Sequence, residues 1–274
     1  MKPVGPIETV HLFPPLHMEL MTLLKGLSPA DWLCETVCAG WQVRDIVAHL
    51  LDGDIRKLSP AKEGSRPPAP ESPINGYQDL VSFLNQINAD WIRATGRMSP
   101  RLLIDFLAIT GPQVSELLAG LDPNAKARNS VAWAGELISP NWFDIAREYT
   151  EKWHHQQQIR DAVGAPGLTS RQWLFPALDT FVRALPHTYR EVDAGEGATI
   201  LVTITGEAGG EWSLVQRGQG WILHSGAAPS PVCRIKLDQD AAWRLFTKQP
   251  NQQVHIRGDL SLGNVFLGTL AVMA

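Results

Sequence analysis

The stretch AGWQVRDIVAHL, residues 39–50, decides how the rest of the chain is interpreted. Apolar residues recur at helical spacing from its middle onward, which predicts an amphipathic helix over 43–58. His49 lies off the apolar stripe, on the side that also holds Asp45 and Asp52. A histidine in that place is solvated, paired with one of these aspartates, or a metal ligand.

A second stretch, TEKWHHQQQIRDAVG at 150–164, lies in a helix predicted over 140–163. Glu151 and His155 are four residues apart, so both side chains project from one face. A solvent-facing pair of this kind stabilises a helix by about 0.2–0.5 kcal/mol. Taken alone, this helix favours the solvated pair over a metal site.

The two polar faces would form a metal site if they turned toward each other. His49, Glu151 and His155 would then offer two imidazoles and one carboxylate, which suits zinc or a related divalent ion and leaves positions for water or substrate. The ligands would be neutral imidazoles and an ionised carboxylate. Asp45 would either orient the His49 ring or pair with Arg44 or a neighbouring turn.

The longer stretch CETVCAGWQVRDIVAHL, residues 34–50, resembles the signature of the mycothiol-dependent maleylpyruvate isomerase N-terminal domain. That family belongs to the wider DinB-like group of four-helix metal-binding proteins. The matching positions are Ala39, Gly40, Trp41, Val43, Arg44, Asp45 and His49. In its later helix the family has a glutamate, a histidine four residues on, and then Ala-x-Gly, as at Glu151, His155 and 162–164.

The resemblance implies that His49, Glu151 and His155 are the three protein ligands of a divalent metal, with zinc as first choice and nickel or another ion as alternatives. The family's usual run of a hydrophobic residue, His, any residue, Trp and Asp is replaced here by HHQQQIRD. Thiol and substrate specificity are therefore not simply inherited. His154 is an alternative ligand, but its spacing from Glu151 and the family register favour His155.

The resemblance covers most of the chain and implies an α plus α+β fold class. A DinB-like four-helix bundle is expected over 1–167, followed by a small α+β, sterol-carrier-like domain over 168–274. Before Gly167, helices are expected at 7–26 (distorted at Pro14–Pro15), 43–58, 77–95, 100–121 and 140–163, with a surface loop at 59–76. After it, we expect a helix at 169–191, strands at 198–205, 233–238 and 253–259, a hairpin at 211–226, and helices at 238–248 and 260–273.

The composition is that of a globular protein with no partner among nucleic acids or membranes. Hydrophobic residues make up 44% of the 274 residues and charged residues 19%, which excludes a disordered chain. The net charge of −4 gives no basic excess for a phosphate backbone. No continuous apolar run approaches the roughly 20 residues of a membrane span, and no signal peptide is recognisable, so a cytoplasmic location is expected. The three cysteines are expected as buried or half-buried thiols.

The implied chemistry is that of a thiol activated at a divalent metal. In the family a low-molecular-weight thiol such as mycothiol adds to an unsaturated diacid, which allows cis–trans rotation before elimination. We therefore expect an isomerase acting on maleylpyruvate-like substrates or a thiol S-transferase. Its partners would be a small-molecule thiol and an electrophilic substrate; the sequence does not indicate an oligomeric state.

Two other functions stay open. One is a non-catalytic protein that keeps the metal and holds an apolar ligand; the other is a metal-dependent hydrolase. Arg257 is a candidate catalytic cation for a carboxylate substrate if the second domain covers the metal, although a surface arginine at a strand end is the simpler interpretation. The remaining histidines lack partner spacing and are expected to be structural or exposed: His11, His17, His187, His224 and His255.

Overall fold

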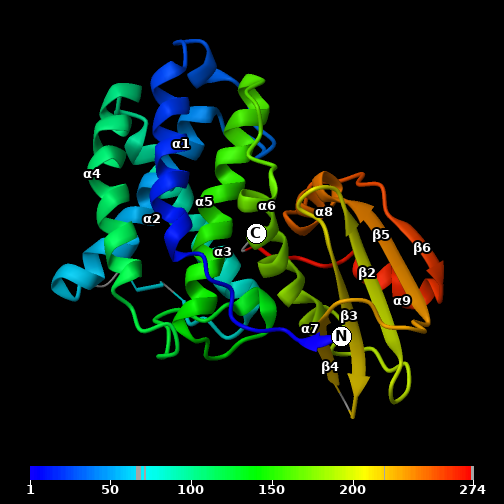
Figure 1. Cartoon of the computed structure of the whole chain (residues 1–274). Coiled ribbons are helices and arrows are strands. Elements are labelled where there is room, and N and C mark those ends of the chain that lie inside the picture. The colour runs from blue at the N-terminus through cyan, green and yellow to red at the C-terminus, as the bar shows by residue number, and fades with distance from the viewer. Residues whose placement is uncertain (66–68, 71, 219, 273–274) are drawn as a thin grey trace. The chain divides into compact units, whose positions relative to one another are not determined.

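The computed structural model describes residues 1–65, 69–70, 72–218 and 220–272 (Figure 1). These residues pack as two compact units. Among the described residues, the helical unit consists of Thr9–Asp122 and Glu151–Gly167; the sheet unit consists of Met1–Glu8, Pro123–Thr150 and residues 168–272. Helix α5 (Asn141–Val163) contributes to both units. The division into 1–167 and 168–274 stays a prediction.

The helical unit is built on four helices and the second half of α5. The four are α1 (Phe13–Gly26), α2 (Val43–Glu63), α3 (Tyr77–Thr95) and α4 (Pro100–Ala119), with short 3-10 turns η1 (Val10–Leu12) and η2 (Asp31–Leu33). Helices α1, α2, α4 and α5 bury apolar side chains in one shared core, which includes Leu20, Val47, Leu51, Leu103 and Ile159, and partly buried side chains of α3 pack against it. This core fixes how the polar faces of α2 and α5 are presented.

Three boundaries in this unit differ from the sequence expectation. The first helix begins at Phe13 and not at residue 7, because Pro14 and Pro15 start the helix and do not distort it. The second continues to Glu63 with Pro60 inside its last turn, so the loop expected from residue 59 begins at Gly64, whose φ of 65° ends the helix. Residues 66–68 and 71 of that loop lie outside the described residues. The fourth helix ends at Ala119 and not near 121.

In the sheet unit, the described residues form a six-stranded sheet with the order β1-β4-β3-β2-β5-β6. The strands are β1 (Lys2–Pro3), β2 (Thr199–Thr205), β3 (Gly210–Arg217), β4 (Gly220–Ser225), β5 (Cys233–Asp238) and β6 (His255–Gly258). β2 and β5 pair in parallel and the other neighbours pair antiparallel. The parallel pair requires a crossover between its strands, and the antiparallel hairpin β3–β4 lies within that crossover.

Helices of the sheet unit complete its core. They are α6 (Arg171–Phe181), α7 (Leu185–Thr188), α8 (Gln239–Phe246) and α9 (Leu260–Phe266), with 3-10 turns η3 (Ala132–Ala134) and η4 (Val182–Ala184). Phe246 lies 5.9 Å, between ring centroids, from both Phe181 and Phe266, so one aromatic cluster joins α6, α8 and α9.

The α plus α+β fold class is confirmed, with local corrections in the sheet unit. The helix expected over 169–191 is divided into α6, η4 and α7, and Pro186 stands in the first turn of α7. The last helix ends at Phe266, well before residue 273, which lies outside the described residues. β1 was not expected at all, because a two-residue strand carries no alternation in the sequence.

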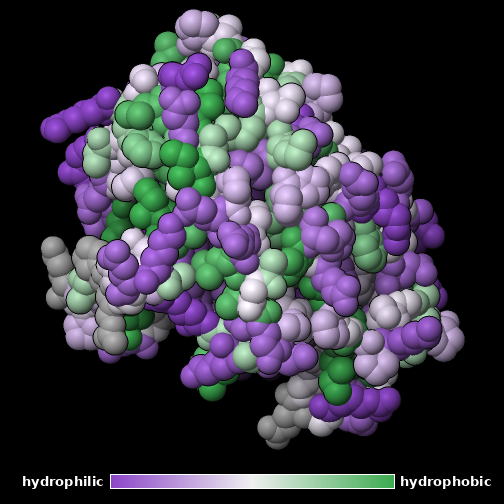
Figure 2. All heavy atoms as spheres, turned by 60° about the vertical axis from the view of Figure 1, so that its left-hand side comes forward, coloured by the Kyte–Doolittle hydropathy of each residue, from purple (hydrophilic) through white to green (hydrophobic). Residues whose placement is uncertain are grey.

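Helix α4 is an exception to the expectation that no segment of the chain is long and apolar enough to span a membrane. By length and mean hydropathy Pro100–Ala119 is long and apolar enough to cross a membrane. This is weak evidence, since core helices pass the same test, and Leu103 and Leu107 of α4 are buried in the helical unit. The opposite face of α4 exposes Phe106 and Ile109. On the face of the molecule drawn in Figure 2, apolar side chains are interspersed with polar ones.

Candidate metal centre

His49 is positioned by a helix whose start is fixed by its own side chains. The Gln42 side chain accepts from the backbone of Asp45, and the Asp45 carboxylate accepts from the Gln42 backbone N–H at 3.0 Å, which is a capping box. Asp45 therefore caps α2 and does not orient the His49 ring. Arg44 donates to the carbonyls of Thr95 and Gly96, at 3.3 and 3.2 Å, so the start of α2 is tied to the end of α3.

The His49 ring is packed between two other rings. Its centroid lies 5.3 Å from that of Trp41 and 4.8 Å from that of His155, both edge-on. Burial, and then the electrostatic effect of the neighbouring His155 ring, lowers the pKa of His49 to about 3. The imidazole is therefore neutral at physiological pH, as a metal ligand must be.

One nitrogen of His49 has no partner. Among the described residues, nothing forms a hydrogen bond with Nδ1 of His49, although this atom is buried. A buried polar atom without a partner costs about 1–3 kcal/mol and calls for an explanation, of which an ion is one. The unpartnered Nδ1 of His49 therefore fits the role of a metal-ligand residue for His49.

Glu151 and His155 approach the same place from α5. Oε2 of Glu151 lies 3.5 Å from Nε2 of His155, and the two side chains are only 23% and 11% exposed. The solvated Glu–His pair, which the helix alone favoured, is therefore wrong. The structure places the His49 ring beside the His155 ring, and His155 lies beside Glu151, so the three expected ligand residues are neighbours in the helical unit. Their role as metal ligands stays a prediction.

His154 belongs to the same cluster. Glu151, His154 and His155 each offer a ligand atom, and these three atoms lie within 4.8 Å of one another. The rings of His154 and His155 are tilted against each other with centroids 4.0 Å apart. This group, found among the described residues, supplies one carboxylate and two imidazoles and does not include His49, whose ring contacts that of His155 from α2.

The amide of Gln158 completes the surroundings of His155. Its Oε1 lies 2.8 Å from Nδ1 of His155 and accepts a longer hydrogen bond, 3.5 Å, from the thiol of Cys38. Gln158 is buried, and Cys38 is half-buried in the loop before α2. The sequence reasoning missed both residues: Gln158 follows His155 at helical spacing, which is a usable signal, whereas nothing in the sequence points to Cys38.

A family model matches the part of the chain that contains these residues. The model of the mycothiol maleylpyruvate isomerase N-terminal domain matches residues 13–160, more than half of the chain. The chain belongs to this family. The matched segment contains His49, Glu151, His155 and their neighbours.

Solved structures share the fold of this protein over nearly the whole of its chain. A crystal structure of the mycothiol-dependent maleylpyruvate isomerase has a TM-score of 0.56 and 12% sequence identity, and the match covers 93% of this chain and 95% of that one. A point mutant of that enzyme matches with a TM-score of 0.55 and the same identity and coverage. No curated protein matches the sequence. At this identity the likeness establishes the fold alone.

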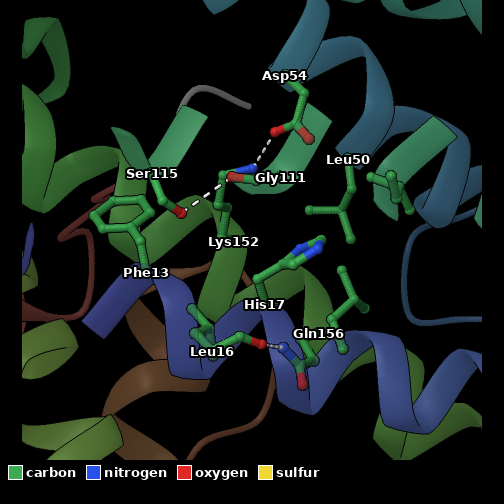
Figure 3. A pocket seen from close by; sticks show the side chains of 11 residues that line it. Phe13, Leu16, His17, Leu50, Asp54, Gly111, Ser115, Lys152 and Gln156 are labelled. Carbon is green, nitrogen blue, oxygen red and sulfur yellow. Dashed lines mark hydrogen bonds and ion pairs between the residues drawn. The ribbon is translucent and has the colours of Figure 1, made fainter. Parts of the chain in front are cut away.

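A small cavity lies in the helical unit (Figure 3). It is on a different side of α5 from Glu151 and His155. It is lined by Phe13, Leu16, His17, Leu20, Leu50, Asp54, Leu107, Gly111, Ser115, Lys152 and Gln156. Lys152 is ion-paired with Asp54, whose other oxygen accepts from Thr110 at 2.6 Å. Burial lowers the pKa of His17, which keeps that imidazole neutral. The expectation that His17 is structural fits this surrounding.

Arg257 lies on β6 of the sheet unit. Its side chain is exposed, and its cross-strand neighbour on β5 is Arg234, also exposed. This placement agrees with a surface arginine and also leaves the guanidinium free of the sheet core. A catalytic role for Arg257 stays a prediction.

Proposed function

We propose that this protein holds a divalent metal ion with His49, Glu151 and His155 and uses a low-molecular-weight thiol such as mycothiol. The reaction is isomerisation of maleylpyruvate-like substrates or transfer of the thiol to an electrophilic small molecule. Family membership supports the reaction class, and the structural neighbours carry the name mycothiol-dependent maleylpyruvate isomerase. The observation that carries the proposal is the contact of His49 with the Glu151–His155 pair, together with the unpartnered Nδ1 of His49.

The donor set favours certain ions. Two imidazoles and a carboxylate suit zinc, with nickel as an alternative because imidazole is a suitable ligand for both ions. When bound, such an ion acts as a Lewis acid that lowers the pKa of a thiol, so that thiolate is available at neutral pH.

The chain's own residues prepare the site for that chemistry. Burial keeps His49 neutral, so its lone pairs are not blocked by a proton near pH 7. The Glu151 carboxylate offsets part of the positive charge of a divalent ion. Trp41 packs edge-on against His49 and restricts the rotation of that ring. Together these contacts hold the ligands in place before an ion arrives, which reduces the conformational entropy lost on binding.

Metal analysis of the purified protein tests the ligand set. We expect one divalent ion per chain, lost in the His49→Ala, Glu151→Gln and His155→Ala variants and kept in His154→Ala. His154 is the matched control, because it lies in the same cluster at the neighbouring position. If His154→Ala loses the ion and His49→Ala keeps it, the ion belongs to Glu151, His154 and His155 instead.

Assays with and without thiol test the reaction. The metal-loaded protein should convert a maleylpyruvate-like diacid or modify an electrophile only when mycothiol or another small thiol is added. Bound metal without any thiol affinity would favour a non-catalytic binding protein, and turnover without thiol would favour a hydrolase. The cytoplasmic location and the absence of nucleic-acid and membrane partners stay predictions.

A further inference from the structure

The side-chain oxygen of Gln158 faces two groups that carry protons. Nδ1 of His155 lies 2.8 Å from it and the Cys38 thiol 3.5 Å. An amide oxygen has two lone pairs and accepts from both groups at once, provided that His155 carries its proton on Nδ1. Burial raises the pKa of Cys38, so its S–H remains a donor at neutral pH. Both contacts therefore agree on one orientation of the amide.

We propose that Gln158 is a positioning residue of the metal centre, whose side-chain oxygen holds His155 in the tautomer with the proton on Nδ1. The lone pair of Nε2 then points toward Glu151, 3.5 Å away, where the ion is expected. The inference rests on the proposed function, because it assigns Gln158 a role toward the same ion. No tautomer other than this one leaves Nε2 available as a ligand atom.

The chemistry of the acceptor has a consequence for the site. Hydrogen bonding of the second ring nitrogen to an acceptor orients a ligating imidazole and raises its basicity, most strongly when the acceptor is a carboxylate. Gln158 is neutral, and it shares its oxygen with the Cys38 thiol. It therefore orients His155 while adding little electron density, which leaves the bound ion a stronger Lewis acid than a carboxylate acceptor would.

Histidine nitrogen NMR of the metal-free protein tests the tautomer directly. The wild type should show His155 protonated on Nδ1 and unprotonated on Nε2. Gln158→Leu, which keeps the size of the side chain and removes the acceptor, should lose this preference, and Gln158→Glu should retain it. Gln156→Leu is the matched control on the same helix, because Gln156 bonds to the Leu16 carbonyl and to Arg160, away from His155. This control should keep the tautomer. Protonation on Nε2 in the wild type, or an unchanged tautomer in Gln158→Leu, would overturn the inference.

Metal titration supplies the second readout. With zinc in competition with a chromophoric chelator, Gln158→Leu should bind about 10–100-fold more weakly than the wild type, which is the usual effect of losing such a partner. Gln158→Glu should bind zinc at least as tightly as the wild type, because a carboxylate acceptor raises the basicity of the ligating ring, and Gln156→Leu should stay close to the wild type. If the wild type binds zinc and Gln158→Leu binds it equally well, only this inference fails. If the wild type binds neither zinc nor nickel, the proposed function fails and the inference fails with it.

Discussion

Lys152 of α5 forms an ion pair with Asp54 of α2, with 2.5 Å between Nζ and Oδ1. The Asp54 side chain is 1% exposed, and Lys152 directly follows Glu151 in the chain. The pair therefore connects the two helices that supply the candidate ligands, and it does so in a part of the helical unit from which water is largely excluded.

Removal of one partner of this pair should destabilise the protein strongly. Lys152→Met leaves Asp54 as a buried charge without its cation, which typically costs about 3–5 kcal/mol. The double variant Asp54→Leu/Lys152→Met should recover much of that loss, because no charge then remains buried. Urea unfolding measures the free energies. Arg101→Gln is the control: it removes the exposed Arg101–Asp105 pair and should change stability by less than about 1 kcal/mol. If Lys152→Met and Arg101→Gln lower the free energy of unfolding equally, the prediction is contradicted.

Gly111 allows α4 to approach His17 of α1. A Cβ at Gly111 would lie 2.2 Å from a ring carbon of His17, closer than any real contact. Gly111→Ala should therefore lower the free energy of unfolding by about 1–3 kcal/mol, and His17→Ala should relieve part of this cost in the double variant. Gly53→Ala in α2 is the control, because a Cβ there meets nothing within 4 Å. It should raise stability by about 0.5–1 kcal/mol through helix propensity. Thermal unfolding of the four variants distinguishes these outcomes.

The metal-free protein should lose stability in acid through His49. The pKa of His49 is about 3 in the folded chain, below its ordinary value of 6.5, so between these values the unfolded state binds a proton that the folded state does not. The contribution is complete above pH 6.5 and falls as the pH drops toward 3, with a slope of at most about 1.4 kcal/mol per pH unit. Urea unfolding of wild type and His49→Gln between pH 7 and 4 isolates the effect. If both proteins lose stability in parallel, His49 is not the cause.

Arg257→Ala should leave the metal content unchanged and reduce turnover of a carboxylate substrate. The expectation is that the guanidinium binds the substrate carboxylate, and an arginine–carboxylate pair is difficult for another residue to replace. Arg234→Ala is the matched control, since Arg234 is the exposed cross-strand neighbour of Arg257. Steady-state kinetics of the two variants give the answer: equal turnover in both removes Arg257 from the mechanism.

The sequence predicted the fold class and the proximity of His49, Glu151 and His155, because both depend on short-range patterns; the ligand role of these residues stays a prediction. The apolar stripe of α2 and the four-residue spacing of Glu151 and His155 are readable within one helix, and the family signature joined them. The ends of the helices were harder to predict from the sequence. α2 was expected to end near Leu58, yet the helix continues to Glu63 with Pro60 inside it, since one lost hydrogen bond near a helix end is tolerated.

Contacts between distant segments could not be predicted. Asp54 and Lys152 are 98 residues apart, and Cys38 and Gln158 are 120 apart. Neither pair has a local signal, because their meeting depends on how α2, α5 and the loop before α2 pack in three dimensions. The burial of the polar face of α5 was missed for the same reason. A helix rich in His and Gln reads as solvated until its neighbours are known.

The separation of the candidate ligands along the chain bears on when the centre can form. During synthesis at about 5–20 residues per second, Glu151 follows His49 by roughly 5–20 s. In that interval α2 to α4 can fold, but the carboxylate and the second imidazole have not yet been made. A nascent chain that ends before residue 151 contains His49 alone of the three. Metal uptake at this centre would therefore be a late event, and bound metal would mark a helical unit that α5 has already completed.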